Sequence, residues 1–472
     1  MENEEKGSVP FYILTPFKDM NKLTRRNFLK TSAIASGPLI FTGLAMGQAG
    51  MSALYTLSVA LIGGGGIARG SAFRECEKNN VVAIADVDDV RGAPGFEAFP
   101  QAKRYRDFRR LLDAHARELD AAIVSTPDHT HFPATYAAME RGIAVQTQKP
   151  LTHNIWEART LQKAAHKFKV QTVMGNQGHN FEGMKLIREW IEAGLIGEVQ
   201  EVHMWTNRVT PNNRNALNPL PAQPVPDTLD WDLWTGPAEM GPYNEELCPK
   251  GWRWWWSYGN GGLADIGCHT LDIAVYALGL GFPTSVHVDN SLNFSHELHD
   301  NPPKDGAWSY VYEFPCPGKS PLKIYWYEGG HLPRMPESIK PVFEDEKQLA
   351  GGCLLVGDKN TIYSPGMRPK EPRLVDNWQD LQHHLPPKTL PRAVGNPVAE
   401  LFAAIRGEID KCGSNFDYAA PLTEIVLLGT IANRSGKIVE YLPDTMTFKD
   451  SSLNKYIKEP VRKGWEYGEG LI

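Results

Sequence analysis

The sequence predicts an α/β protein with a doubly wound parallel sheet, followed by a second domain that mixes helices and strands. Short apolar runs alternate with helix-like segments over residues 57–174, and the first run ends in a glycine turn. Strand-like runs rich in Val, Tyr, Trp and Thr recur between residues 199 and 328. The chain has 472 residues, about three times the ~150 of a typical domain. We therefore expect two domains and a processed segment.

The composition is that of a folded protein with a small-molecule partner. Hydrophobic residues make up 42% and charged residues 22% of the chain, close to average globular usage. The net charge of −6 offers no basic footprint for nucleic acid. The six cysteines are scattered without a CxxC pair, so neither a disulfide scaffold nor a zinc site is predicted. The 13 Trp and 16 Tyr favour a carbohydrate, because amphipathic rings cover sugar faces, although most such rings serve packing.

The N-terminal segment, residues 1–49, has the pattern of an export signal that is removed. Thr24–Lys30 carries a twin-arginine pair, and a mildly apolar, Gly/Ala-rich stretch follows over residues 31–46. This stretch is shorter than the ~20 strongly apolar residues of a membrane span. We expect export to the periplasm and no stable membrane insertion after processing. Met20 is an alternative start that gives a more compact signal.

The first apolar run leads into a glycine turn suited to a dinucleotide. Residues 57–62 end at Gly63-Gly64-Gly65-Gly66-Ile67-Ala68, and a helix-compatible segment covers about 69–78. The first glycine permits a tight turn, the third lets the backbone approach a pyrophosphate, and the alanine allows close packing of helix on strand. The predicted phosphate-binding residues are Gly63, Gly65, Gly66, Ile67 and Ala68.

An acid follows the second apolar run. Residues 81–85 end in Asp86, 23 residues after Gly63, where a carboxylate that binds the adenosine ribose is expected. Such an acid accepts hydrogen bonds from the 2′-hydroxyl and repels a 2′-phosphate, so NAD is favoured over NADP. The alternative is that Asp86 merely starts a turn.

Further strand–helix units complete the predicted sheet. An apolar run covers residues 121–124, further strand segments are predicted at 143–148 and 170–174, and the helix-like segments are about 131–141 and 156–167. Ligands of such sheets lie at the carboxyl ends of the strands. This places Thr126-Pro127, Gln148-Lys149-Pro150 and Asn176-Gln177 around one crevice.

Several motifs in this order resemble the glucose-fructose oxidoreductase and inositol dehydrogenase family (Gfo/Idh/MocA) over about residues 57–440. They are Gly63-x-Gly-x-x-Ala, Thr126-Pro127-Asp128-His129-Thr130-His131, Gln148-Lys149-Pro150 and Asp265-Ile266-Gly267-Cys268-His269-Thr270-Leu271-Asp272. Asn415-Phe416-Asp417-Tyr418 and Glu424 resemble an exported bacterial subgroup. Besides the turn and Asp86, the resemblance implies cofactor contacts from Thr126, Pro127, His131, Gln148 and Asn176.

The resemblance also implies the domain plan. We expect a Rossmann NAD-binding domain over 50–175, a substrate and oligomerisation domain over 176–445 and a tail over 446–472. The second domain would carry a large, mostly antiparallel open sheet that covers the nicotinamide end of the cofactor and forms a homo-oligomer. The sequence agrees, with a predicted helix at 182–193, strands at 199–208, 308–314 and 322–328, and a long loop at 211–226.

Three polar residues share one face of a predicted helix. Asp265, His269 and Asp272 follow i, i+4, i+7 spacing after a glycine pair. The resemblance implies that His269 accepts the proton of the substrate hydroxyl, while Lys149 and Asp265 hold and polarise the substrate; a neutral imidazole suits this role. Alternatively, Asp265 is a helix cap, His269 a core histidine and Asp272 a structural carboxylate.

Other expected substrate contacts are Gln177, Trp252 and Arg253. The run Trp252–Trp256 near Asp265 is either a sugar-facing wall or a packed domain edge. Many family members have Glu where this chain has Gln148, and that change removes a charge beside Lys149. No metal site is predicted, because the histidines lack ligand spacing.

Three functions follow. The first is a periplasmic NAD-dependent oxidoreductase that converts a secondary hydroxyl of a sugar, polyol or glycoside into a ketone. The second is a redox-neutral glycoside hydrolase or lyase with tightly bound NAD, which oxidises a sugar carbon transiently, eliminates the aglycone and reduces the carbon again. Export favours this closed cycle, because free NAD is scarce outside the cytoplasm. The third is a sugar-binding protein without turnover, against which intact Lys149, Asp265 and His269 argue.

Overall fold

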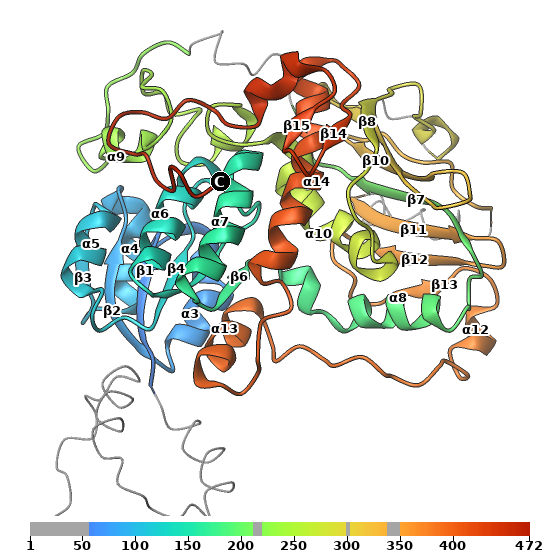
Figure 1. Cartoon of the computed structure of the whole chain (residues 1–472), viewed down its shortest axis with the longest axis horizontal. Coiled ribbons are helices and arrows are strands. Elements are labelled where there is room, and N and C mark those ends of the chain that lie inside the picture. Colours follow the sequence, from blue (N-terminus) through green and yellow to red (C-terminus); the bar gives the residue numbers. More distant parts are fainter. Residues whose placement is uncertain (1–55, 211–219, 299–302, 338–349) are drawn as a thin grey trace, which may run out of the picture.

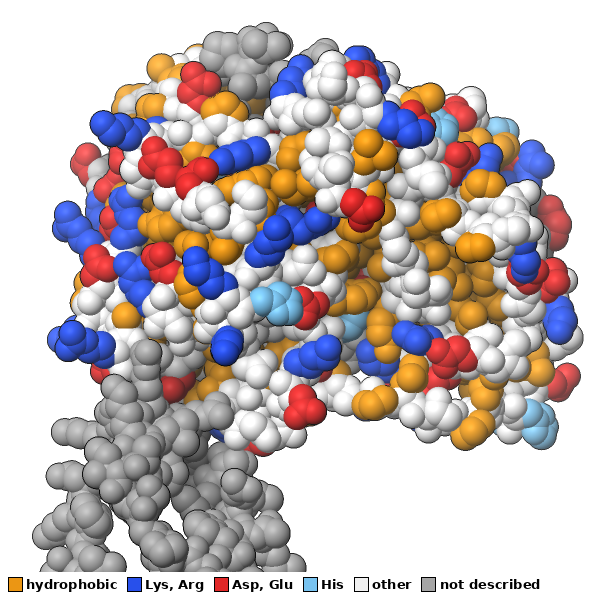
Figure 2. All heavy atoms as spheres, in the orientation of Figure 1, with side chains coloured by type: hydrophobic (Ala, Val, Ile, Leu, Met, Phe, Trp, Pro, Cys, Tyr) orange, Lys and Arg blue, Asp and Glu red, His pale blue; other side chains and the backbone are white. Residues whose placement is uncertain are grey.

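The computed structural model describes residues 56–210, 220–298, 303–337 and 350–472 (Figure 1). The predicted export signal lies outside these residues, as does most of the predicted loop at 211–226. No helix in the described part of the chain is long and apolar enough to cross a membrane. Figure 2 shows acidic and basic side chains interspersed over one face, with hydrophobic side chains between them on both halves, including the half that carries the larger sheet.

The first sheet has six parallel strands in the order β3-β2-β1-β4-β5-β6, which confirms the doubly wound prediction. Its strands are β1 (Ser58–Ile62), β2 (Asn80–Ala85), β3 (Lys103–Tyr105), β4 (Ala121–Val124), β5 (Ala144–Thr147) and β6 (Thr172–Met174). The helices between them are η2 (Gly66–Arg69), α3 (Ser71–Cys76), α4 (Asp89–Ala98), α5 (Phe108–His115), α6 (Asp128–Glu140) and α7 (Ile155–Phe168).

Local sequence explains where these helices begin. The Asp88 carboxylate accepts hydrogen bonds from Val90 N and Arg91 N at the start of α4, and Asn154 forms a capping box with Glu157 at the start of α7. The segment predicted as one helix over 69–78 is instead a 3₁₀ turn followed by the short α3, because Gly70 breaks the helical path between them.

The second sheet has seven strands in the order β13-β12-β11-β7-β10-β9-β8, and only the β7–β10 pair is parallel. Its strands are β7 (Val199–Thr206), β8 (Ser285–Val288), β9 (Trp308–Phe314), β10 (Leu322–Glu328), β11 (Gly351–Gly357), β12 (Thr361–Pro365) and β13 (Arg373–Leu374). A mostly antiparallel second sheet is therefore confirmed. Figure 1 shows the two sheets on opposite sides of α10 (Gly261–Leu278) and α14 (Phe416–Ser435).

The remaining elements are short or lie beside these sheets. They are η3 (Gln177–Asn180), α8 (Glu182–Glu192), α9 (Trp231–Thr235), η4 (Gly251–Trp254), η5 (Ser295–Glu297), α12 (Trp378–Leu381), α13 (Pro397–Arg406), β14 (Tyr441–Leu442), β15 (Thr447–Phe448) and η7 (Ser451–Tyr456). The helix predicted at 182–193 corresponds to α8.

The chain returns to the first domain near its C-terminus. Helix α13 packs on β5 and β6, and its apolar residues join the core cluster that contains β1 and β2. The segment after η7 then lies along the helices of the first domain: Trp156 N donates to the Ile457 carbonyl at 2.9 Å, and Gly468 packs against Thr160 and Tyr136. The predicted boundary at residue 175 therefore does not include these C-terminal segments, which pack on the first domain.

A buried ion pair connects the two domains. Arg159 on α7 makes two hydrogen bonds, of 2.9 and 2.7 Å, to the carboxylate of Glu424 on α14. The Glu424 side chain is fully buried, and Tyr441 also donates to it at 2.9 Å. Removal of the arginine leaves a buried carboxylate without its counter-charge.

We expect Arg159→Ala to lower the free energy of unfolding by about 3 kcal/mol, the scale for breaking a buried ion pair. Lys449→Ala removes a pair with Glu440 in which both side chains are exposed, so its effect should stay below about 0.5 kcal/mol. Urea denaturation of both variants measures the difference. Equal losses in the two variants would contradict a stabilising role for the buried pair.

Candidate active site

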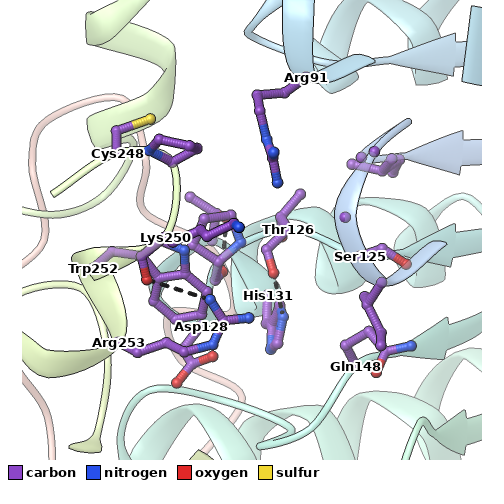
Figure 3. Close-up of a pocket in the computed structure, with 18 of the residues that line it drawn as sticks. Arg91, Ser125, Thr126, Asp128, His131, Gln148, Cys248, Lys250, Trp252 and Arg253 are labelled. Atoms are coloured by element: carbon purple, nitrogen blue, oxygen red, sulfur yellow. Dashed lines mark hydrogen bonds between the residues drawn. The ribbon is translucent and has the colours of Figure 1, made fainter. Parts of the chain in front are cut away.

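A cavity of about 690 Å³ opens between the two domains at the carboxyl ends of β1, β2, β4 and β5. Figure 3 shows Ser125 and Gln148 near the turn after β1, with Arg91 projecting from α4 into the cavity. The segment that carries Cys248, Lys250, Trp252 and Arg253 faces them from the other side. The cavity therefore has one wall from the parallel sheet and one from later parts of the chain.

The glycine turn fits a pyrophosphate. Gly63 has φ +97°, which L side chains rarely adopt, and a Cβ on Gly65 would lie 2.0 Å from the Arg91 carbonyl oxygen. Among the described residues, the N–H groups of Gly65 and Gly66 have no acceptor. They line the cavity and are available to phosphate oxygens.

Asp86 lies at the other side of this turn. Its carboxylate accepts hydrogen bonds from Gly64 N at 2.9 Å and from Asp88 N at 3.1 Å. Burial raises the pKa of Asp86 to about 6, so the group is mainly ionised at neutral pH. An ionised carboxylate that lines the cavity beside the glycine turn fits a ribose hydroxyl.

At the opposite end, Lys149 meets Asp265 across the crevice. The ammonium of Lys149, just after β5, donates to Asp265 Oδ1 at 2.9 Å and to the Asp265 carbonyl. Arg253 Nε lies 3.5 Å from the same Oδ1. Burial alone would raise the pKa of Asp265, but Lys149 and Arg253 together hold it well below its usual range. Asp265 is thus a permanent anion that orients Lys149, and is not a proton acceptor.

His269 lies one helical turn further along α10 and is 1% exposed. Burial lowers its pKa well below 6.5, and the nearby charges of Lys149 and Arg368 lower it further. The imidazole is therefore neutral at pH 7, and a neutral ring has a nitrogen that can accept a proton. Arg368 Nη2 lies 3.5 Å from Nε2, whereas Nδ1 is buried and has no partner among the described residues.

The structure brings fifteen of the seventeen predicted site residues into one cavity wall. Ala68 instead belongs to the apolar core behind the turn. Asn176 is fully buried and donates from Nδ2 to Asp272 at 3.0 Å. Asp272 also contacts His179 at 3.1 Å and the Tyr418 hydroxyl, in a closed network that favours the structural interpretation of this carboxylate.

His131 has a structural role that its motif did not reveal. Its ring nitrogens lie 2.8 Å from the Pro150 carbonyl oxygen and 2.9 Å from that of Thr126. Burial lowers its pKa to about 4. The neutral ring has one N–H and donates to one of these two carbonyl oxygens, while it lies between the loops after β4 and β5, which carry Thr126 and Lys149.

Some residues of the run Trp252–Trp256 face the cavity, as a sugar-facing wall would, and others pack in the protein interior. Trp252 and Trp254 line the cavity, while Trp255 joins an apolar cluster with residues of α9 and Trp256 is buried outside the cavity wall. Arg253 stacks its guanidinium 4.3 Å from the Trp252 ring centroid. The cavity wall thus contains a guanidinium and an aromatic ring side by side.

Several cavity residues were not identified from the sequence. They are Arg91, Arg106, Phe108, Ser125, Asp128, Arg208, Leu233, Trp234, Cys248, Lys250, Met367, Arg368 and Trp465, among others. Of these residues, Asp128 lies inside the motif Thr126–His131, and that motif could have identified it as a site residue. Arg368 and Trp465 lie in irregular segments far along the chain, where no periodicity or motif marks them. In the described part of the chain, no group of three His, Cys, Asp or Glu side chains is arranged to hold a metal ion.

The fold and the cavity define a dinucleotide-binding α/β protein, and comparison with known proteins gives the family. The model of the oxidoreductase family's NAD-binding Rossmann fold matches residues 57–176, and that of its C-terminal alpha/beta domain matches residues 183–299. The chain belongs to the Gfo/Idh/MocA oxidoreductase family.

Individual relatives are more distant. The chain is 28% identical to the D-glucoside 3-dehydrogenase of Escherichia coli over 235 residues, 49% of this chain and 56% of that protein, so it spans about half the length of this curated relative. The inositol dehydrogenase homologue of Azotobacter vinelandii, solved with NADH and myo-inositol, has a TM-score of 0.52 at 18% identity and covers 82% of this chain and 98% of its own. The WlbA dehydrogenase of Chromobactrium violaceum, solved with NADH and UDP-GlcNAcA, gives 0.55 at 16%, covering 82% and 96%. These structures share the fold.

We expect Gly65→Ala to weaken NAD binding by about 10- to 100-fold, because the new Cβ must push the turn away from the Arg91 carbonyl, an overpacking that costs about 1–3 kcal/mol. Gly281→Ala, whose Cβ would meet nothing within 4 Å, is the matched control. Calorimetric titration of protein freed of its dinucleotide measures both. Unchanged affinity in Gly65→Ala would show that the turn does not receive the pyrophosphate.

Proposed function

We propose that the protein is an NAD-dependent oxidoreductase that converts a secondary hydroxyl of a sugar, polyol or glycoside into a ketone. One observation carries this proposal: Lys149 and His269, from different domains, line one end of a cavity whose other end is formed by the glycine turn and Asp86. A substrate bound between these ends would lie beside the nicotinamide.

The two residues divide the work on one hydroxyl. Lys149 has three N–H donors and uses two on Asp265, so the third is free to donate to the substrate oxygen. His269 is neutral and takes the hydroxyl proton as the carbonyl forms. NAD, when bound, supplies the acceptor for the hydride that leaves the same carbon. Asp265 keeps the ammonium in place and remains ionised throughout.

Tight retention of the dinucleotide is part of the proposal, and a cover over the adenosine end supports it. Asp89 N donates to the Thr228 carbonyl at 3.0 Å, and Asp230 N donates to the Val87 carbonyl at 2.9 Å. These bonds join the loop after β2 to the segment before α9. We expect these contacts to slow the departure of a dinucleotide past Asp86.

The C-terminal segment reinforces that cover. Arg462 donates to the Gly236 carbonyl at 2.9 Å and to Asp232 at 2.7 Å, so the last residues are tied to α9. The Arg109 guanidinium stacks 4.3 Å from the Trp465 ring, and Trp465 itself lines the cavity. Three distant parts of the chain thus enclose one end of the site.

The test uses purified protein with no added cofactor. Denaturation should release NAD or NADH, and incubation with a panel of sugars and glycosides should reduce the bound dinucleotide. We expect His269→Ala to slow this reduction by roughly 10²- to 10⁴-fold, the usual scale for general acid–base catalysis, with the dinucleotide still bound. Lys149→Ala should also slow it, and the double variant should lose less than the product of the two single losses. Release of NADP alone, or full activity in His269→Ala, would overturn the proposal.

A second function, redox-neutral cleavage of a glycoside, is favoured by Asp128. Asp128 is 6% exposed and lines the cavity, yet its carboxyl group makes no hydrogen bond or ion pair with any described residue. Burial raises its pKa to about 7, although Lys149 and Arg253 favour the charged form. Oxidation of an alcohol needs one proton acceptor, and His269 fills that role in the proposed mechanism. A second group that exchanges protons near neutrality is available for the further proton transfers of glycoside cleavage.

In the redox-neutral cycle, Asp128 would act after the ketone has formed. The carbonyl acidifies the neighbouring C–H, and a basic group of the site removes that proton. The aglycone then leaves with the electron pair of the glycosidic bond and takes up a proton. Water then adds to the resulting double bond, and the hydride returns to the ketone carbon. The sugar and the aglycone are separated with no net change in NAD.

We expect Asp128→Asn to lower aglycone release by about 10²-fold or more while bound NAD is still reduced at a rate within a few-fold of the unaltered protein. Absorbance of the reduced nicotinamide and chromatography of the aglycone follow the two steps. If Asp128→Asn slows both steps equally, or no glycoside is cleaved, the net oxidoreductase is the remaining function.

Export and oligomerisation complete the proposal. The twin-arginine route carries folded proteins, which suits a protein that must acquire its dinucleotide in the cytoplasm. The open face of the seven-stranded sheet is the proposed oligomer interface.

Replacement of Arg25 and Arg26 by lysine should leave the precursor in the cytoplasm, because both arginines of the signal are lost. Cell fractionation with detection of the cleaved and uncleaved forms measures this outcome. Normal processing and a periplasmic location in the double variant would exclude the twin-arginine route.

A further inference from the structure

The substrate end of the cavity is more positive than a neutral sugar requires. Among its described residues, the cavity wall contains seven lysines and arginines but only four aspartates. Asp86 and Asp88 lie at the dinucleotide end with Arg91 and Arg106. The cations near Asp128 and Asp265 are Lys149, Arg208, Arg253 and Arg368, and Lys250 also lines the cavity.

The carboxylates present do not satisfy these cations. Asp265 is already shared between Lys149, at 2.9 Å, and Arg253, at 3.5 Å. Burial drives Asp128 toward its neutral form. Arg368 has no carboxylate within ion-pair distance among the described residues, and its Nε is buried without a hydrogen-bond partner.

Arg368 is nevertheless held in a defined position. Thr270 on α10 donates to the carbonyl of Met367 at 3.1 Å, which pins the loop after β12 against the catalytic helix. The stem of Arg368 lies beside Gly178, where an added Cβ would be 3.4 Å from its Cγ. Its Nη2 lies 3.4 Å from Gln177 Oε1 and 3.5 Å from His269 Nε2, both long contacts. A fixed guanidinium with weak partners is ready for a better acceptor.

We propose that the substrate is an anionic sugar, a uronic acid or a glycoside of one, whose carboxylate is bound by Arg368. This inference rests on the proposed function in that it takes the cavity to bind a sugar at His269. A planar carboxylate matches the paired donors of a guanidinium, and the exposed Arg208 and Lys250 add positive potential at the rim.

The same contact would couple binding to catalysis. The positive charge of Arg368 is one of the groups that lower the pKa of His269. A carboxylate bound to Arg368 offsets that charge, so the imidazole becomes a stronger base when the anionic substrate is in place. A neutral sugar would leave His269 weakly basic, so the two substrate classes should differ in turnover as well as in affinity.

The test compares sugars that differ only at one carbon. Methyl glucoside and methyl galactoside are paired with the corresponding uronic acids, and binding to the purified holoprotein is measured by calorimetry. We expect each uronic acid to bind at least about 10-fold more tightly than its neutral partner, the scale of a hydrogen bond to a charged group. Glucose 6-sulfate shows whether any oxyanion suffices or a carboxylate is needed.

Arg368→Gln should bring the uronic acid and its neutral partner within about 3-fold of each other. Lys370→Gln is the matched control, because it removes a charge two residues away that is exposed and outside the cavity wall; it should keep the preference. Thermal unfolding of both variants checks that they are folded. If Arg368→Gln weakens both partners equally, the guanidinium serves a hydroxyl or the cofactor, and the inference is overturned.

Binding and dinucleotide reduction are separate measurements, so the two proposals can fail separately. Uronic acid that binds through Arg368 without reducing NAD would contradict the oxidoreductase and leave the anionic ligand standing. Neutral sugars oxidised as well as or better than uronic acids would support the oxidoreductase and overturn the anionic substrate. Absence of binding by every uronic acid and sulfate ester would also overturn it.

Discussion

The contact between Lys149 and Asp265 is the constraint on which the site depends. Lys149 follows a strand of the first domain and Asp265 lies on a helix of the second, 116 residues later, so the ion pair sets the spacing of the two domains at the cavity. It also explains why the chain can have Gln148 where many family members have a glutamate. The counter-charge of Lys149 comes from across the crevice, and the amide leaves that pairing undisturbed.

The parallel sheet could be predicted because its central strands are buried on both faces: residues 121–124 form an uninterrupted apolar run, and 143–145 begin another that ends in the buried polar residues 146–148. Elements without that signature were missed. β3 is three residues long and mostly exposed. β11 begins with two glycines, the second packed against the Trp205 ring, so its sequence lacks strand character although its residues are buried. α4 contains two glycines and a proline and owes its start to the Asp88 cap.

The site could be predicted where sequence order matches spatial order. The turns after successive strands of a parallel sheet must meet at one edge, which gathers residues 63–66, 86, 126–127 and 148–149 without any knowledge of the second domain. Arg208, Arg368 and Trp465 reach the cavity only through tertiary packing, and no local pattern marks them. Asn176 follows the same edge rule, yet its side chain turns away to Asp272, a choice set by burial and hydrogen bonding.

Electrostatics at the substrate end must satisfy two opposite demands at once. In the proposed mechanism, Asp265 stays ionised to hold Lys149 and His269 stays neutral to accept a proton, although His269 is buried and the Asp265 side chain on the same face of α10 is only 15% exposed. A surplus of positive charge meets both demands, because cations stabilise a carboxylate and destabilise an imidazolium. The same surplus opposes proton uptake by His269 during turnover. An anionic substrate would offset this positive charge and make protonation of His269 easier. Before the substrate binds, the surplus of positive charge keeps Asp265 ionised and His269 neutral; once an anion is bound, proton transfer to His269 is favoured.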